Sequence, residues 1–121
     1  MTIYISLPIT GYDEADRREL CESAKEFIRQ RFISLADAIS PFDIAPIVRA
    51  EHPEPDYGDF MGADIAVLIR RADAVLFLVN PERTPSKGVR LEYACAQIFG
   101  KQGWIARLNA DGSINDCIKI L

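Results

Sequence analysis

Two acidic residues occupy helix positions that would normally carry apolar side chains. Residues 87–99 have the apolar spacing of an amphipathic helix. At about 100° per residue, Glu92 falls inside its apolar arc, roughly opposite Lys87. A carboxylate that faces a protein core costs several kcal/mol unless it is paired or lines a cavity. We therefore expect Glu92 to line a cavity; the alternative is a structural ion pair with Arg71 or Arg107.

Asp64 breaks the pattern of residues 59–71 in the same way. It stands four residues from both Phe60 and Leu68, on or beside the apolar stripe of that predicted helix. Two carboxylates on the inward faces of neighbouring helices suit a nucleophile or base that works with an acid or an orienting group.

Two loops supply polar groups near the same place. Ser86 is a good helix N-cap, and Gly88 in the first turn leaves the backbone amides open to a phosphate or hydroxyl group. The simpler alternative is that Ser86 only caps the helix. Residues 7–11 follow a predicted strand and include Thr10, which is placed to contact a ligand unless this loop is a plain strand-to-helix turn. The phosphate-binding patterns GxxxxGK[ST] and GxGxxG are absent.

Apolar runs and helical periodicity alternate along the chain. We predict strands at residues 3–6, 38–42, 74–79 and 104–108, and helices at residues 13–32, 59–71 and 87–99. The pattern indicates one α/β domain over residues 1–121: a three-layer αβα fold of flavodoxin or Rossmann type with a mostly parallel sheet of four or five strands. Ligands of such folds bind beyond the carboxyl ends of the strands, here after Ser6, Phe42 and Val79. We interpret residues 51–56, with the sole histidine His52, as a solvated loop.

Composition narrows the possible partners. The 121 residues include 14 Lys+Arg and 18 Asp+Glu, a net charge of −4, which argues against nucleic-acid binding. No apolar run approaches the ~20 residues of a membrane span, and the first residues do not resemble a signal peptide, so we expect a cytoplasmic protein with no membrane partner. One histidine gives little material for a metal site, and we expect no cofactor. Cys21, Cys95 and Cys117 are expected to be buried and reduced.

Three segments resemble the nucleoside 2-deoxyribosyltransferase-like superfamily, and in particular its short members of the DUF4406 type. They are YISLPITG at residues 4–11, DFMGADI at residues 59–65, and the pattern Ser86-x-Gly88-x-x-x-Glu92. The resemblance covers nearly the whole chain in order and spacing. Leu7 departs from it, since many relatives have Gly there, and residues 80–85 lack an aromatic residue that is frequent in the short branch.

The resemblance implies roles for individual residues. Glu92 is the nucleophile that attacks the anomeric carbon of a deoxyribosyl group, Asp64 contacts the base or sugar, and Tyr4 holds the nucleophilic carboxylate. The position of Ser86 is an aspartate in transferases of free nucleosides and a serine in relatives that hydrolyse deoxynucleoside 5′-monophosphates, where it helps to hold the phosphate. The implied substrate-binding residues are Ser6, Pro8, Thr10, Gly11, Ser86 and Gly88.

The expected function is therefore cleavage or transfer at the N-glycosidic bond of a (deoxy)nucleoside or its 5′-monophosphate. An ionised carboxylate stabilises the oxocarbenium-like charge that develops at the anomeric carbon, and it can capture that carbon covalently. The alternatives are a catalytically silent nucleotide-binding module, and a structural oligomer that would leave Glu92 and Asp64 unexplained. We expect a homo-oligomer, a dimer or a dimer of dimers, with the site near the subunit interface.

Overall fold

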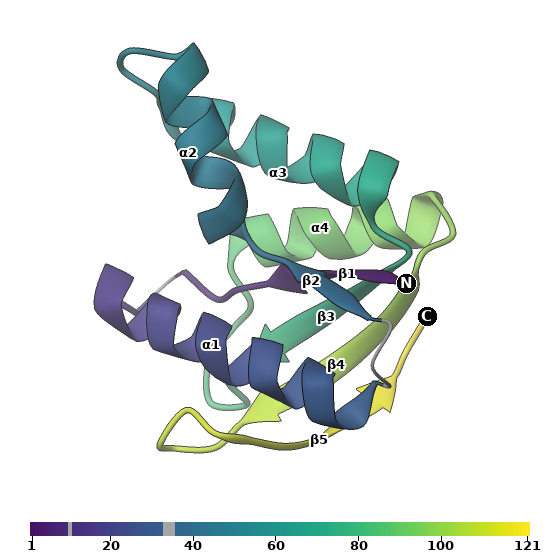
Figure 1. The fold of residues 1–121 in the computed structure, drawn as a ribbon. Helices are drawn as coiled ribbons and strands as arrows, with labels where there is room; N and C mark the ends of the chain where they lie inside the picture. Colours follow the sequence, from purple (N-terminus) through teal and green to yellow (C-terminus); the bar gives the residue numbers. More distant parts are fainter. Residues whose placement is uncertain (10, 33–35) are drawn as a thin grey trace.

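A computed structural model describes residues 1–9, 11–32 and 36–121 of the protein. Five strands form one sheet in the order β2-β1-β3-β4-β5 (Figure 1). Strands β1 to β4 run parallel, and β5 pairs antiparallel with β4 at the edge. Their bounds are β1 Thr2–Ser6, β2 Asp37–Ile39, β3 Ala74–Val79, β4 Gln102–Leu108 and β5 Ile114–Lys119. The mostly parallel α/β fold is confirmed.

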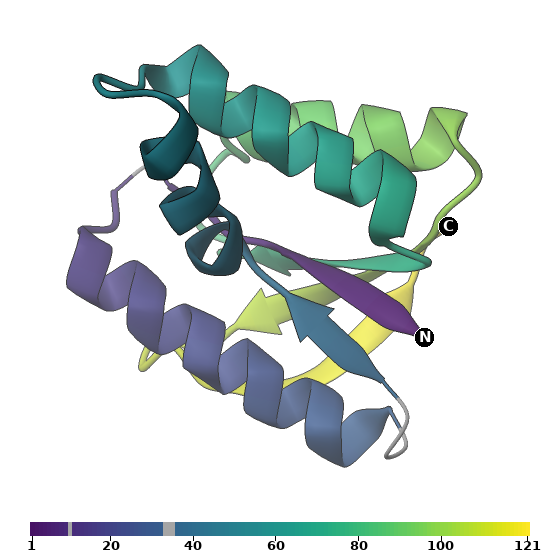
Figure 2. The ribbon, with the colours of Figure 1, turned by 45° about the horizontal axis from the view of Figure 1, so that its top comes forward.

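The described residues form four helices, which cover the two faces of the sheet. Helix α1 (Glu14–Arg31) lies on one face, whereas α2 (Pro41–Glu51), α3 (Tyr57–Arg71) and α4 (Lys87–Ile98) lie on the other (Figures 1 and 2). The arrangement is the three layers that the alternation of strands and helices predicts.

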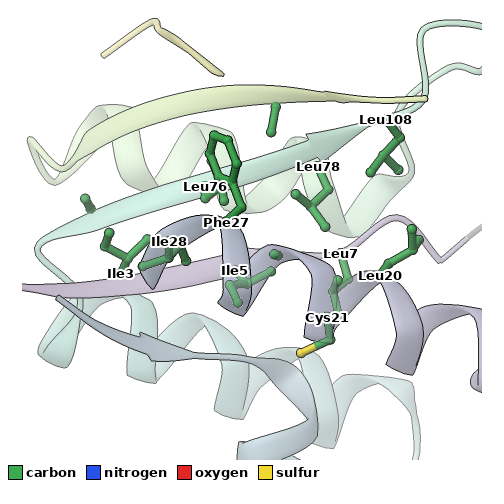
Figure 3. Packing of buried hydrophobic residues seen from close by; sticks show 13 residues of the cluster. Ile3, Ile5, Leu7, Leu20, Cys21, Phe27, Ile28, Leu76, Leu78 and Leu108 are labelled. Atoms are coloured by element: carbon green, nitrogen blue, oxygen red, sulfur yellow. The ribbon is translucent and has the colours of Figure 1, made fainter. Parts of the chain in front are cut away.

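The strands divide their side chains between these layers. Ile3 and Ile5 of β1 join Leu76, Leu78 and α1 in one apolar cluster, which Figure 3 shows at close range. Because successive side chains of a strand point to opposite faces, Tyr4 and Ser6 face α2, α3 and α4 instead. The sequence alternation of β1 thus fixes which of its residues can reach Glu92.

The segment after β2 differs from the prediction. Residues 38–42 were expected to form a strand, but β2 ends at Ile39 and α2 begins at Pro41. Ser40 and Asp43 form a capping box, and a proline suits the first helical position because its missing N–H needs no partner there. Local capping therefore overrides the apolar character of the segment.

Two elements were not predicted at all. Helix α2 contains Pro46, which weakens the helical signal, and β5 is a polar edge strand with mostly exposed residues. The expected solvated loop is exposed from His52 to Glu54, although Glu51 still belongs to α2.

No disulfide joins the cysteines; Cys21 is buried, but Cys95 and Cys117 are only half-buried, so the expectation of burial is wrong for these two. Among the described residues, no helix is long and apolar enough to cross a membrane.

Candidate active site

Glu92 lies in the second turn of α4 and faces the sheet. Only 4% of its surface is exposed, and the helix residues that share its inward side are Gly88, Val89 and Ala96. Its Oε1 accepts a hydrogen bond of 2.9 Å from the hydroxyl of Ser6 at the end of β1. Within the described part of the chain Glu92 makes no salt bridge, so the alternative of an ion pair with Arg71 or Arg107 is wrong.

Tyr4 lies on the same face of β1 as Ser6 and is fully buried. Its hydroxyl has no partner in hydrogen-bonding geometry among residues 1–9, 11–32 and 36–121. It nevertheless lies close enough to Glu92 for each group to shift the pKa of the other. A buried hydroxyl without a partner costs stability, and such exceptions often mark functional sites.

Asp64 comes from α3, one helical turn after Phe60, and lies in the same cleft as Glu92. The cleft has a volume of about 270 Å³, and both carboxylates line it together with Gly88. The prediction that Glu92 lines a cavity at the mouth of the sheet agrees with the structure, and Asp64 lines the same cavity from the neighbouring helix.

Burial favours the uncharged, protonated form of both acids. Desolvation raises the pKa of Glu92 to about 7, against the stabilising effect of the Tyr4 and Ser6 hydroxyls on its carboxylate. Desolvation also raises the pKa of Asp64 to about 7. Burial, reinforced by the two acids, raises the pKa of the Tyr4 hydroxyl well above its usual value, so this group keeps its proton. Both carboxyl groups therefore change protonation state near neutral pH.

The walls of the cleft are aromatic and its rim is charged. Phe42 from α2 and Tyr57 and Phe60 from α3 offer flat apolar surfaces, and Arg17 and Arg49 lie at the rim. None of these five residues was predicted to belong to the site, although Phe42 is the last residue of a predicted strand, after which ligands were expected. The remaining lining residues are Leu7, Ile9, Glu14, Pro41 and Met61.

Gly88 lets α3 approach α4 closely at the cleft. A Cβ at this position would lie 3.2 Å from the Tyr57 hydroxyl and 3.4 Å from Sδ of Met61, closer than most side-chain contacts. The glycine at the helix start thus keeps space for the cleft wall, in addition to exposing backbone amides.

A smaller pocket of about 20 Å³ adjoins the start of α4. Pro8 and Ser86 line it together with Tyr12, Asn80 and Arg83. The Ser86 Oγ accepts a hydrogen bond of 3.3 Å from the Val89 amide, so its capping role is confirmed. Asn80 and Arg83 lie in the loop after β3, where ligands were expected, but neither residue was predicted to bind one.

The loops after β1 and β3 meet above this pocket. Asn80 Nδ2 donates a hydrogen bond of 3.0 Å to the Tyr12 hydroxyl, and the Arg83 guanidinium lies over the Tyr12 ring at 5.4 Å. Gly11 has a φ of +83°, and the guanidinium of Arg83 fills the space that a side chain at this position would need. Thr10 lies outside the described residues.

The predicted binding residues therefore fall into two groups. Gly88 lines the cleft with Glu92 and Asp64, whereas Pro8 and Ser86 line the smaller pocket and Gly11 lies beneath Arg83. Ser6 is buried below Glu92. In the described part of the chain, no group of three His, Cys, Asp or Glu side chains is arranged to hold a metal ion.

The sheet order, the layers and the cleft at the carboxyl ends of the strands define an α/β protein with a nucleoside 2-deoxyribosyltransferase-like fold. The chain belongs to the DUF4406 family, which is described as a domain of unknown function. Residues 1–103 of the chain match the model of that family.

The fold is similar to that of a solved structure, a "2-desoxiribosyltransferase from Leishmania mexicana". The TM-score is 0.62 at 18% identity, and the match covers 95% of this chain and 78% of that one. No curated protein matches the sequence.

Proposed function

We propose that this protein cleaves or transfers at the N-glycosidic bond of a (deoxy)nucleoside or its 5′-monophosphate, with Glu92 as nucleophile. The observation that carries the proposal is a buried glutamate that has no cationic partner in the described chain and lies beside a second carboxyl group in one cleft. The similar fold of a deoxyribosyltransferase agrees with it.

The first step forms a glycosyl ester. A carboxylate oxygen of Glu92 attacks the anomeric carbon, the C–N bond breaks, and its electron pair goes to the base nitrogen. Asp64, whose pKa burial raises to about 7, donates a proton to the departing base in the molecules in which it is protonated and Glu92 is ionised. The Ser6 hydroxyl orients the attacking carboxylate, and the Tyr4 hydroxyl is available to stabilise it.

The second step frees the enzyme. Water, or the nitrogen of a second base, attacks the anomeric carbon and displaces Glu92. Asp64 takes back a proton from the attacking group. Water makes the protein a hydrolase, and a second base makes it a transferase.

We place a 5′-phosphate or 5′-hydroxyl group at the small pocket beside α4. The N-terminal amides of α4 and the guanidinium of Arg83 provide donors and positive charge there. Lys87 lines neither pocket and has no part in this proposal.

We further propose that the protein is a homo-oligomer. Leu91, Ala94 and Ile98 are spaced along one face of α4, and Leu91 and Ile98 are 45% and 76% exposed. Because helices of soluble proteins rarely leave such a stripe in water, we assign this face of α4 to a contact with a second copy.

The test is incubation of the protein with a panel of deoxynucleosides and their 5′-monophosphates, with and without a second base, followed by chromatography of the bases. We expect base release by the wild type and none by Glu92→Gln. Binding of these compounds without any base release would identify a silent nucleotide-binding module and contradict the proposal.

A further inference from the structure

Arg17 is an unpaired guanidinium at the rim of the cleft. It lies in the first turn of α1, is half-buried and lines the cleft that contains Glu92 and Asp64. Among the described residues its side chain has no ion pair, hydrogen bond or ring contact. Its neighbour Arg18, by contrast, pairs with Glu14 at 3.5 Å and lies over the ring of Phe42 at 4.4 Å.

Arg49 approaches the same cleft from another helix. It belongs to the last turn of α2, and its guanidinium lies 5.6 Å from the centre of the Phe60 ring on α3. Within the described chain it forms no salt bridge. Figure 2 shows α2 between α1 and α3, and the two arginines, one from α1 and one from α2, both line the cleft.

The cleft is the place for the base. Phe42, Phe60 and Asp64 line it together with the two arginines, whereas the loops after β1 and β3 line the small pocket, where we placed the 5′ group. Aromatic rings stack on nucleobases, and Asp64 must reach the base to protonate it.

We propose that Arg17 and Arg49 make the cleft selective for bases whose edge carries carbonyl groups in place of amino groups, such as uracil, thymine and hypoxanthine. The inference rests on the proposed function. A guanidinium has five N–H donors and no acceptor, so it pairs with carbonyl oxygens but leaves an exocyclic amino group without a partner. Arg17 is half-buried, so an amino group placed against it loses hydrogen bonds to water without gaining a replacement.

The same residues assist departure of the base. As the C–N bond breaks, its electron pair passes to the ring nitrogen and delocalises onto the carbonyl oxygens. Guanidinium groups beside those oxygens stabilise the negative charge until Asp64 delivers its proton. An amino-substituted base offers fewer such oxygens to the two arginines.

Matched nucleoside pairs test the selectivity independently of turnover. Binding of deoxyuridine and deoxycytidine, and of deoxyinosine and deoxyadenosine, is measured by calorimetry on the Glu92→Gln variant. We expect the carbonyl member of each pair to bind at least fivefold more tightly. Addition of R17Q and R49Q should bring the ratio below twofold, whereas R29Q, on the same helix as Arg17 but paired with Glu26, should leave it unchanged.

The outcomes separate this inference from the proposed function. A ratio below fivefold, no binding of any of the four nucleosides, or a preference that survives R17Q and R49Q overturns the inference. If the preference follows the arginines but the wild type releases no base from any nucleoside, the proposed function fails and the selectivity stands. Base release at equal kcat/KM from both members of each pair contradicts the selectivity alone.

Discussion

The hydroxyl of Ser6 donates a 2.9 Å hydrogen bond to Oε1 of Glu92, which lies 86 positions later in the chain. Ser6 ends β1 and Glu92 lies in the second turn of α4, so this contact joins the first strand to the last helix. The bond holds a carboxylate that is almost completely buried and has no cation beside it among the described residues. It fixes one oxygen of a carboxyl group that also lines the cleft.

Glu92→Gln should abolish base release and leave the fold intact. The amide keeps the size of the side chain but cannot act as a nucleophile, and loss of a nucleophile typically lowers the rate by orders of magnitude. Chromatography of released bases measures the effect. Glu51→Gln, at the exposed end of α2, is the matched control and should retain full activity. Activity of Glu92→Gln within a few-fold of wild type would exclude the covalent role.

The same substitution should stabilise the protein in alkaline solution. The folded pKa of Glu92, about 7, lies above its usual 4.5, so the native state holds an extra proton between these values and stability falls as pH rises through that window. Glutamine does not titrate. The free energy of unfolding of Glu92→Gln should equal that of the wild type near pH 4 and exceed it by roughly 3 kcal/mol above pH 8. Urea unfolding at several pH values measures this, and equal pH dependence of the two proteins would contradict the raised pKa.

The pH–rate profile of base release should be bell-shaped. Glu92 must be ionised to attack, and Asp64 must hold a proton to donate, so activity should fall on both sides of neutrality. The two apparent pKa values belong to the pair of acids. Asp64→Asn should lower the rate and remove the alkaline limb, because no acid is left to deprotonate. A pH–rate profile of kcat/KM tests this; an alkaline limb that persists in Asp64→Asn would assign it to another group.

Tyr4→Phe should slow base release but have little effect on the stability of the fold. The Tyr4 hydroxyl is buried without a hydrogen-bond partner in the described chain but favours the carboxylate of Glu92, so its removal should change stability by no more than about 1 kcal/mol. Base release should nevertheless slow by about tenfold if the hydroxyl stabilises the carboxylate during reaction. Thermal melting and steady-state kinetics measure the two effects. A clear loss of stability with normal kinetics would make Tyr4 a purely structural residue.

Ser86→Asp should discriminate between nucleotide and nucleoside. Aspartate can still cap α4, but its charge would repel a phosphate in the pocket that Arg83 and the helix start line. Charge-assisted hydrogen bonds contribute ~1.5–3 kcal/mol each, so binding of a 5′-monophosphate should weaken at least tenfold while a free nucleoside is spared. Calorimetry with matched ligands tests this. Equal or tighter binding of the nucleoside than of its monophosphate by the wild type would place the 5′ group elsewhere.

Ile98→Glu should convert the oligomer to a monomer. Ile98 is the most exposed large apolar residue of α4, and a charge in a desolvated contact would oppose association. Light scattering at assay concentration should give a dimer or tetramer for the wild type and for the control Gln97→Glu, which is also exposed on α4. A monomeric wild type would contradict the proposed assembly.

The sequence determined the elements whose signal is local. The uninterrupted apolar run of β3 and the amphipathic spacing of α1 and α4 can be recognised in the chain alone, because burial on a regular element leaves a periodic pattern. The same periodicity identified Glu92 and Asp64 as inward-facing acids. Helix α2 and strand β5 show no such pattern in the sequence. Helix α2 begins at a capping box, and β5 is held by its pairing with β4.

Only the tertiary structure decided which groups lie near Glu92 and Asp64. That Ser6 bonds to Glu92, that the Tyr4 hydroxyl lacks a partner, and that Arg17 and Arg49 share a cleft rim depend on contacts between distant segments. The separation of Ser86 from Gly88 into two pockets depends on how the loops after β1 and β3 meet. Periodicity gives the direction of a side chain from its own element, but a partner's distance follows from the packing of elements against one another, which no local pattern encodes.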